Sequence, residues 1–249
     1  MSGLFYNLGR RLGRAAVPAI RRTKWAWQSA TGDEDQVLKA EASFGSALAT
    51  ELRASTPPSP NPEYRRQSTE IAQNIERAVR DKRRSLRAEV VRMDAVNAMA
   101  LPGGFVFLSE PLVAFCGAQS DELAFVIGHE MAHIMRRHAW DRMVNQAATR
   151  VVSLVALRTG PLGQWLRHTG IGLLQSAHSQ EAEVEADLLG VRLAHAAGYY
   201  PGGAITLLRR LEQLEPPQLT ALGKYFASHP PAADRLARLL PLCQKLQGG

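Results

Sequence analysis

The hydrophobic pattern predicts a mainly helical chain with one short β region. Between residues 33 and 54, apolar positions recur at the spacing of one helix face. The stretch from Ser55 to Pro62 holds four prolines and ends that helix, because proline cannot continue one. A second helix follows, and its apolar stripe consists of Tyr64, Ile71, Ile75 and Val79.

The only convincing β signal surrounds Pro102-Gly103-Gly104. Two short apolar runs flank this tripeptide, and its glycines supply the backbone freedom that a tight reversal needs. We expect a hairpin or the edge of a small sheet. After Ser109 the pattern is helical almost to the end, with breaks at Gly160-Pro161, Gly198 to Gly203 and Pro216-Pro217. These elements predict an α+β fold that is mainly α.

Positive charge is concentrated in residues 1–30. The 249 residues hold 30 Lys and Arg against 23 Asp and Glu, and residues 1–30 contain no acid. This segment could form a basic amphipathic helix on an anionic membrane surface or a partner, or it could be a solvated arm. We therefore divide the chain into the arm, a helix with a proline-rich linker over residues 31–62, and a folded domain over residues 63–245.

Several function classes are disfavoured by composition. No apolar run approaches the roughly 20 residues of a membrane span, and residues 1–30 lack the apolar core of a secretory signal. Positive charge alone is weak evidence for nucleic acid, so we expect none. Cys116 and Cys243 fit neither a disulfide framework nor a thiolate metal site. We expect a cytoplasmic protein, with peripheral membrane contact through residues 1–30 as an option.

The stretch FVIGHEMAHIMRRHAW, Phe125 to Trp140, contains the pattern H-E-x-x-H. His129 and His133 are four residues apart on a helix that apolar residues surround, so both imidazoles need partners. At this spacing the two Cβ atoms lie about 5–6 Å apart on one face, and both rings can reach one zinc ion. Glu130 lies beside them and could act as a general base. Hydrogen-bonded core histidines are the alternative interpretation.

A catalytic zinc needs a third protein ligand. The extension H-x-x-G-x-x-H fails, because Arg136 stands at the glycine position and Ala139 at the histidine position. His138 would lie on the opposite face of a continued helix, and we expect a structural hydrogen bond from it.

A downstream segment, EAEVEADLLG, offers carboxylates instead. Glu183 and Asp187 are four residues apart, so one could bind zinc while the other accepts the second N–H of a ligand histidine. An acidic face of an ordinary amphipathic helix is the alternative.

Four blocks of the sequence resemble metallopeptidase family 48: NAMALPGGFVF, ELAFVIGHEMAHIMRRH, EAEVEAD and SHPPAADRLARL, in that order. The resemblance runs from about Val90 to Leu240. Members of the family include HtpX heat-shock proteases, CAAX prenyl proteases, mitochondrial Oma-type proteases and bacterial quality-control peptidases. It implies a gluzincin-type zinc metallopeptidase fold over residues 63–245, with a small sheet or hairpin packed beside the H-E-x-x-H helix.

The resemblance also implies a metal centre. One Zn²⁺ per chain would be bound by His129, His133 and Glu183. Glu130 would be the catalytic base, and Asp187 would hold a ligand histidine by a hydrogen bond.

The resemblance also implies roles for further residues. Asn97-Ala98 would belong to the edge strand that pairs with an extended substrate. His229 would approach the zinc as a fourth ligand or as a donor to the oxyanion, with capping of a helix by its loop as the alternative. Gln180 departs from the arginine that the family often has there, and His178 or Arg192 could replace that charge.

The function implied is a zinc-dependent endopeptidase that cleaves unfolded or extended protein segments in quality control. Its partners would be protein or peptide substrates. Two alternatives are a zinc-dependent chaperone-like protein with weak or gated proteolysis and a membrane-surface binding protein that uses residues 1–30. An intact Glu130 argues against the first, since a binding protein needs no base, whereas deletion of residues 1–30 would test the second. A CAAX prenyl protease is disfavoured by the absence of membrane spans. Residues 151–177 could cover the cleft or form a plain helical hairpin.

Overall fold

The computed structural model describes residues 33–117, 120–142, 179–214 and 229–248. The predictions for residues 1–30 and 151–177, and the breaks at Gly160-Pro161 and Pro216-Pro217, lie outside these ranges. Within them, no helix is both long enough and apolar enough to span a bilayer.

The two helices predicted before the β region are confirmed. Helix α3 spans Glu34–Ser55, and Asp33 caps it by accepting a hydrogen bond from the Gln36 amide. Helix α4 spans Pro62–Ala78, and the Asn61 side chain accepts from the first-turn amides. Asp33 and Asn61 thus satisfy amides that have no partner inside their helices.

A three-stranded sheet follows, formed by β1 (Arg87–Val91), β2 (Ala98–Leu101) and β3 (Phe105–Ser109) in the order β1-β3-β2. The predicted hairpin is confirmed as the antiparallel pair β2 and β3, and its turn holds Gly103 and Gly104 at φ 80° and 109°. Strand β1 adds to the other side of β3 in parallel. The sequence pattern did not predict this third strand, because strands distant in sequence leave no local turn signal.

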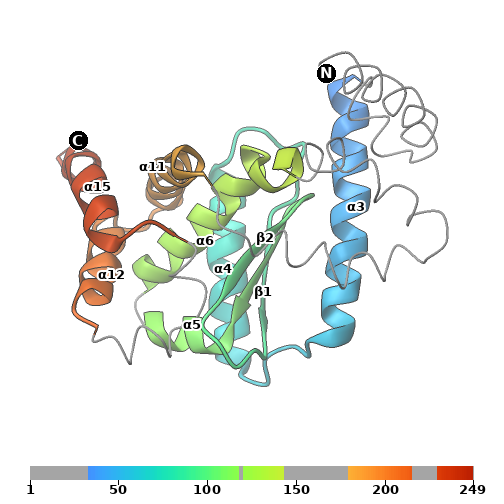
Figure 1. Cartoon of the computed structure of the whole chain (residues 1–249), viewed down its shortest axis with the longest axis horizontal. Helices are drawn as coiled ribbons and strands as arrows, with labels where there is room; N and C mark the ends of the chain where they lie inside the picture. The colour runs from blue at the N-terminus through green and yellow to red at the C-terminus, as the bar shows by residue number, and fades with distance from the viewer. Residues whose placement is uncertain (1–32, 118–119, 143–178, 215–228, 249) are drawn as a thin grey trace, which may run out of the picture.

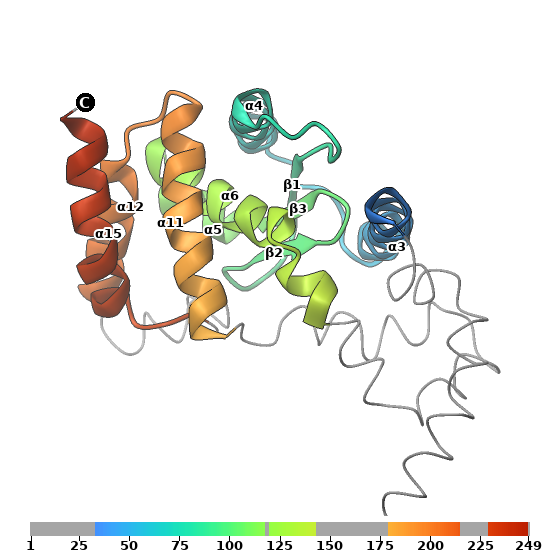
Figure 2. The same ribbon diagram turned by 90° about the horizontal axis from the view of Figure 1, so that it is seen from above.

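Five further helices are complete within the described residues: α5 (Glu110–Cys116), α6 (Ser120–Met135), α11 (Gln180–Ala196), α12 (Gly202–Glu212) and α15 (Ala232–Gln247). Residues 138–142 are helical as well. Seen from above, α3 lies on one side of the sheet and α6 on the other, with α11 and then the α12–α15 pair beyond α6 (Figure 2). Figure 1 shows the same succession, with α3 set apart from the other helices by the sheet. The prediction of a mainly α, α+β fold is confirmed.

The sheet has an apolar core on each face. Val106 and Leu108 belong to the core shared with α4 and α6, whereas Phe105 and Phe107 pack with α3. Alternation along β3 thus covers both faces, as expected when successive side chains point to opposite sides. The core on the α3 side also takes in Trp140. Helix α3 is therefore part of the packed structure rather than a separate appendage.

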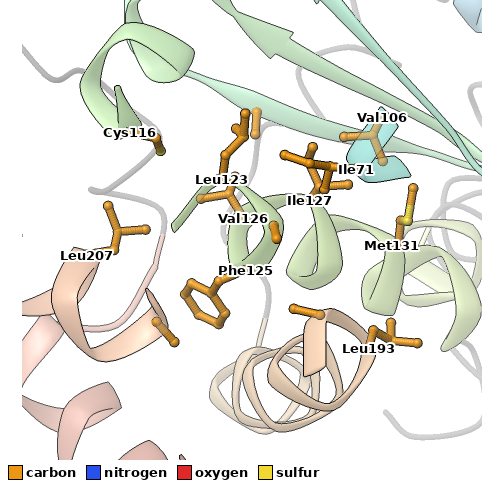
Figure 3. Close-up of a cluster of buried hydrophobic side chains, with 14 of the residues drawn as sticks. Ile71, Val106, Cys116, Leu123, Phe125, Val126, Ile127, Met131, Leu193 and Leu207 are labelled. Carbon is orange, nitrogen blue, oxygen red and sulfur yellow. The ribbon is translucent and has the colours of Figure 1, made fainter. Parts of the chain in front are cut away.

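Helix α6 is the central element of the larger core. Every residue from Glu122 to Ile134 is buried, as expected for a helix that is apolar around most of its circumference. Figure 3 shows Leu123 and Ile127 on the side of the sheet and Phe125 on the opposite side, toward α11 and α12. The histidines of H-E-x-x-H therefore sit on a helix that packing holds on all sides.

Candidate metal centre

Two glycines bring α6 and α11 into backbone contact. A Cβ atom added to Gly128 would lie 2.6 Å from the Gly190 carbonyl oxygen, and one added to Gly190 would lie 2.7 Å from the His129 nitrogen. Neither position has room for a side chain. The close approach brings the carboxylates of α11 to the imidazoles of α6.

The structure brings His129, His133 and Glu183 together. The Nε2 atoms of the two histidines are 3.0 Å apart, and Glu183 oxygens lie 3.4 Å from the His133 Nε2 and 3.7 Å from the His129 Nε2. All three side chains are at most 1 % exposed. Among the described residues, these three form one group with ligand atoms within 4.8 Å of one another.

These separations fit a zinc ion. Donor atoms at about 2.0–2.1 Å from a tetrahedral zinc are about 3.3 Å from each other, and the three observed distances bracket that value. Two imidazole nitrogens and a carboxylate are also a donor set that zinc commonly takes. Two ring nitrogens facing each other at 3.0 Å can share one proton at most, so a cation between them suits the arrangement.

His129 is held from behind by Asp187. The His129 Nδ1 lies 2.9 Å from Oδ1 of Asp187, and Arg235 of α15 donates from Nε and Nη2 to the same carboxylate at 2.9 and 2.7 Å. Burial opposes ionisation of Asp187, but Arg235 and His129 outweigh it and hold its pKa well below the ordinary value. Burial likewise disfavours the His129 imidazolium, yet Asp187 raises the pKa of His129 above its ordinary value.

The sequence did not assign Arg235. It belongs to the block SHPPAADRLARL, six residues after His229, and only the fold shows that the first turn of α15 reaches Asp187. Arg235 thus supplies a buried positive charge at the centre. Of the two residues suggested to replace the arginine missing at Gln180, Arg192 donates to the Leu188 carbonyl instead, and His178 lies outside the described residues.

His229 lies against Glu183 and His129. Its Nδ1 contacts Oε2 of Glu183, and its ring centroid is 5.0 Å from that of His129. Burial lowers the pKa of His229 to about 4, although Glu183 opposes this. Glu130 is 4 % exposed, and its carboxylate, His129 and His229 form a second group with ligand atoms within 4.8 Å. The structure thus places Glu130 beside the proposed ligands.

The expected position of His138 was wrong. Helix α6 ends at Met135 and the chain turns, so that His138 lies against His133 rather than on the opposite face. The two Nδ1 atoms are 2.9 Å apart, and the His138 Nε2 lies 3.2 Å from Oε2 of Glu185. The expected structural hydrogen bond is therefore present, and its partner is a proposed zinc ligand.

The predicted substrate strand lies at an edge of the sheet. Within the described residues, β2 pairs with β3 on one side and with no strand on the other. Asn97 directs its backbone inward, where its amide donates to Ser109 Oγ and its carbonyl accepts from the Ser109 amide. Because these directions alternate along an antiparallel strand, the backbone groups of Ala98 and Ala100 point outward. Ala98, rather than Asn97, therefore presents the open edge.

Comparison with known proteins gives consistent matches. The profile described as Peptidase family M48 matches residues 59–242, which is more than half of the chain. Mitochondrial metalloendopeptidase OMA1 of Schizosaccharomyces pombe is 32% identical over 152 residues, covering 60% of this chain and 44% of that protein. Metalloprotease LoiP of Escherichia coli is 28% identical over 180 residues, covering 70% and 69%.

A third relative is the β-barrel assembly-enhancing protease of Escherichia coli, 27% identical over 164 residues. That match covers 59% of this chain and 32% of the relative. The matched region thus spans less than half the length of the OMA1 and β-barrel assembly-enhancing proteins. Helix α3 precedes the region that the family profile covers.

Proposed function

The chain belongs to peptidase family M48, and from this premise we propose that it is a zinc-dependent endopeptidase acting on unfolded or extended protein segments. One observation carries the proposal. His129, His133 and Glu183 are buried together at separations that suit a tetrahedral zinc, and Glu130 lies beside them. A binding protein has no need of a buried carboxylate at that position.

We propose that the ion is held by His129, His133 and Glu183. When bound, zinc supplies a Lewis acid for the scissile carbonyl and lowers the pKa of a bound water to about 7. Glu130 accepts a proton from the attacking water and delivers it to the leaving amine nitrogen. Asp187 accepts the Nδ1–H of His129, which keeps the Nε2 lone pair directed at the metal.

The edge strand β2 supports the choice of substrate. Outward backbone groups at Ala98 and Ala100 can pair with an extended peptide, and such pairing gives affinity without requiring one sequence. Folded segments have their backbone groups engaged already, so an unfolded segment is the suitable partner. A relative named a β-barrel assembly-enhancing protease supports a role in protein quality control.

For His229 we keep two roles, because its position at Glu183 suits both. As a fourth ligand it would close a resting site, and His229→Ala would weaken zinc binding. As a donor to the oxyanion it would act on the transition state alone, so the same variant would keep its zinc and lose kcat.

The decisive test is Glu130→Gln, assayed by hydrolysis of casein and by zinc content. Losing a general base lowers the rate by about 10²–10⁴-fold, while zinc content stays at one per chain because Glu130 is not a ligand. Glu181→Gln is the matched control, since it makes the same charge change at an exposed position of α11. Casein cleavage by Glu130→Gln at the parent rate would contradict the proposal.

The membrane contact of residues 1–30 and the cytoplasmic location stay predictions. Binding of the protein to anionic vesicles, with and without residues 1–30, would test the contact. If removal of these residues abolished vesicle binding and left proteolysis unchanged, the arm and the peptidase would be separate functions. If wild type and Glu130→Gln cleaved nothing and both bound unfolded protein equally in a zinc-dependent way, the chaperone-like alternative would be favoured.

A further inference from the structure

The side chain that supports His133, the second proposed zinc ligand, differs in chemistry from the side chain that supports His129. A hydrogen-bonded series runs from His133 Nδ1 to His138 Nδ1 at 2.9 Å and from His138 Nε2 to Glu185 Oε2 at 3.2 Å. The other Glu185 oxygen lies 2.9 Å from Arg136 Nε. At His129 the supporting group is the Asp187 carboxylate. At His133 it is the His138 imidazole, which in turn contacts the Glu185 carboxylate.

The protons in this series can be assigned by elimination. A metal at His133 Nε2 requires the lone pair there, so the ring proton of His133 must be on Nδ1. That proton can only be donated to His138 if the His138 Nδ1 is an acceptor. A neutral His138 then carries its own proton on Nε2, where the Glu185 carboxylate accepts it. One arrangement therefore satisfies all three residues and directs the His133 lone pair at the metal.

A specific backbone turn places His138. Arg137 adopts φ 61°, a left-handed conformation that is uncommon for residues other than glycine. Its side chain extends to Glu41 of α3, with 3.5 Å between Nε and Oε2, and Glu41 also pairs with Arg84 at 2.8 Å. Glu41 is 1 % exposed. The turn that brings His138 back to His133 therefore lies within ion-pairing distance of a buried carboxylate from outside the family-matched region.

We propose that His138 and Glu185 are positioning residues that fix the tautomer and the ring orientation of His133 for zinc binding. This inference rests on the proposed zinc site. Partners of this kind, when removed, typically weaken metal binding by about 10–100-fold. His138 acts directly on His133, and Glu185 acts through His138, so the effect of Glu185 is the smaller.

The test is the zinc dissociation constant, measured by competition with a chromophoric chelator. His138→Ala removes the acceptor, and we expect about 10–100-fold weaker binding. His138→Asn places Oδ1 where Nδ1 was and restores an acceptor, so binding should return to within about threefold of wild type. Glu185→Ala should fall between these two variants, and Glu181→Gln should match wild type.

Rescue by asparagine separates positioning from general damage. Thermal unfolding of the metal-free proteins should be similar for His138→Ala and His138→Asn, since both lose the ring, while their zinc affinities differ. Equal affinity of wild type and His138→Ala would overturn the inference and leave the zinc site intact. So would equal weakening by alanine and asparagine. A wild-type protein that binds no zinc would overturn the proposed function itself.

Discussion

The two imidazoles of the H-E-x-x-H motif are held in contrasting ways. His129 is backed by Asp187, which is 4 % exposed and ion-paired with the equally buried Arg235. His133 is backed by the imidazole of His138, and the carboxylate behind it, Glu185, has a side chain that is 44 % exposed. His129 thus contacts a buried ion pair. His133 contacts a relay formed by His138 and Glu185, and the Glu185 side chain is partly exposed to solvent.

Charge bears on this difference. Among the described residues, three carboxylates are buried around the centre, from Glu130, Glu183 and Asp187, and Arg235 is buried beside them, while the partly buried Arg142 also interacts with Glu183. A further carboxylate directly behind His133 would add negative charge to the interior, where an unbalanced charge costs several kcal/mol. The His138 imidazole can orient His133 without adding a carboxylate.

The change expected to have the largest effect on the metal centre removes both supports together. Gly190→Ala places a Cβ 2.9 Å or less from His129 backbone atoms, which forces α11 away from α6. Both Asp187 and Glu185 move with it. We expect a loss of about 1–3 kcal/mol in the free energy of unfolding, together with loss of zinc. Urea titration and metal analysis would measure these.

The matched control is Gly198→Ala, because a Cβ there meets no atom within 4 Å. Its φ of 91° makes alanine strained at that position, so stability falls there as well. Zinc binding should nevertheless persist. Retention of zinc by Gly190→Ala would show that the helix contact does not set the geometry of the centre.

Breaking the support of His129 alone should disturb the metal centre less, although its cost in the free energy of unfolding should be larger. Asp187→Asn removes the Asp187 charge that pairs with the buried Arg235 guanidinium, and breaking a buried pair in this way costs about 3–5 kcal/mol. Urea unfolding of the metal-free protein would measure it. A cost below 1 kcal/mol would mean that Arg235 finds another partner, and that the support of His129 is no stronger than that of His133.

The same pair should make the metal-free protein sensitive to acid. Because the pKa of Asp187 is depressed in the folded state, its contribution to stability is present above the unfolded-state value of about 3.9 and is lost as pH falls below it. The free energy of unfolding of wild type should therefore fall below about pH 5 more steeply than that of Asp187→Asn. Parallel pH profiles of the two proteins would contradict this assignment.

The smallest effect on stability is expected at the relay of His133. Glu185→Gln should change the free energy of unfolding by less than about 1 kcal/mol, because its ion pair with Arg136 is about half exposed on both sides. Urea titration beside Glu181→Gln is the comparison that tests this. A loss as large as that of Asp187→Asn would remove the contrast between the two supports.

The support of His129 was predictable from the sequence, whereas that of His133 was not. Glu183 and Asp187 follow helical spacing, and that periodicity survives in the fold, so their shared face could be inferred. His138 was placed on the wrong face because the prediction continued α6 past Met135. Arg137 then takes a positive φ, which the sequence does not predict because no glycine stands there.

The same distinction holds for the rest of the fold. The helices before the sheet and the β2–β3 hairpin depend on local signals such as Asp33, Asn61 and Gly103-Gly104, and they were predicted. The parallel pairing of β1, the contact of Gly128 with Gly190 and the reach of Arg235 to Asp187 depend on residues distant in sequence. Periodicity carries no information about such pairs.

The central claim is that one zinc ion is bound between α6 and α11. Anomalous diffraction at the zinc absorption edge, from crystals of the zinc-loaded protein, tests it most directly. We predict one peak per chain, at about 2.0–2.1 Å from the Nε2 atoms of His129 and His133 and from a carboxylate oxygen of Glu183. A peak elsewhere, or none between these three side chains in protein that retains zinc, would contradict the account.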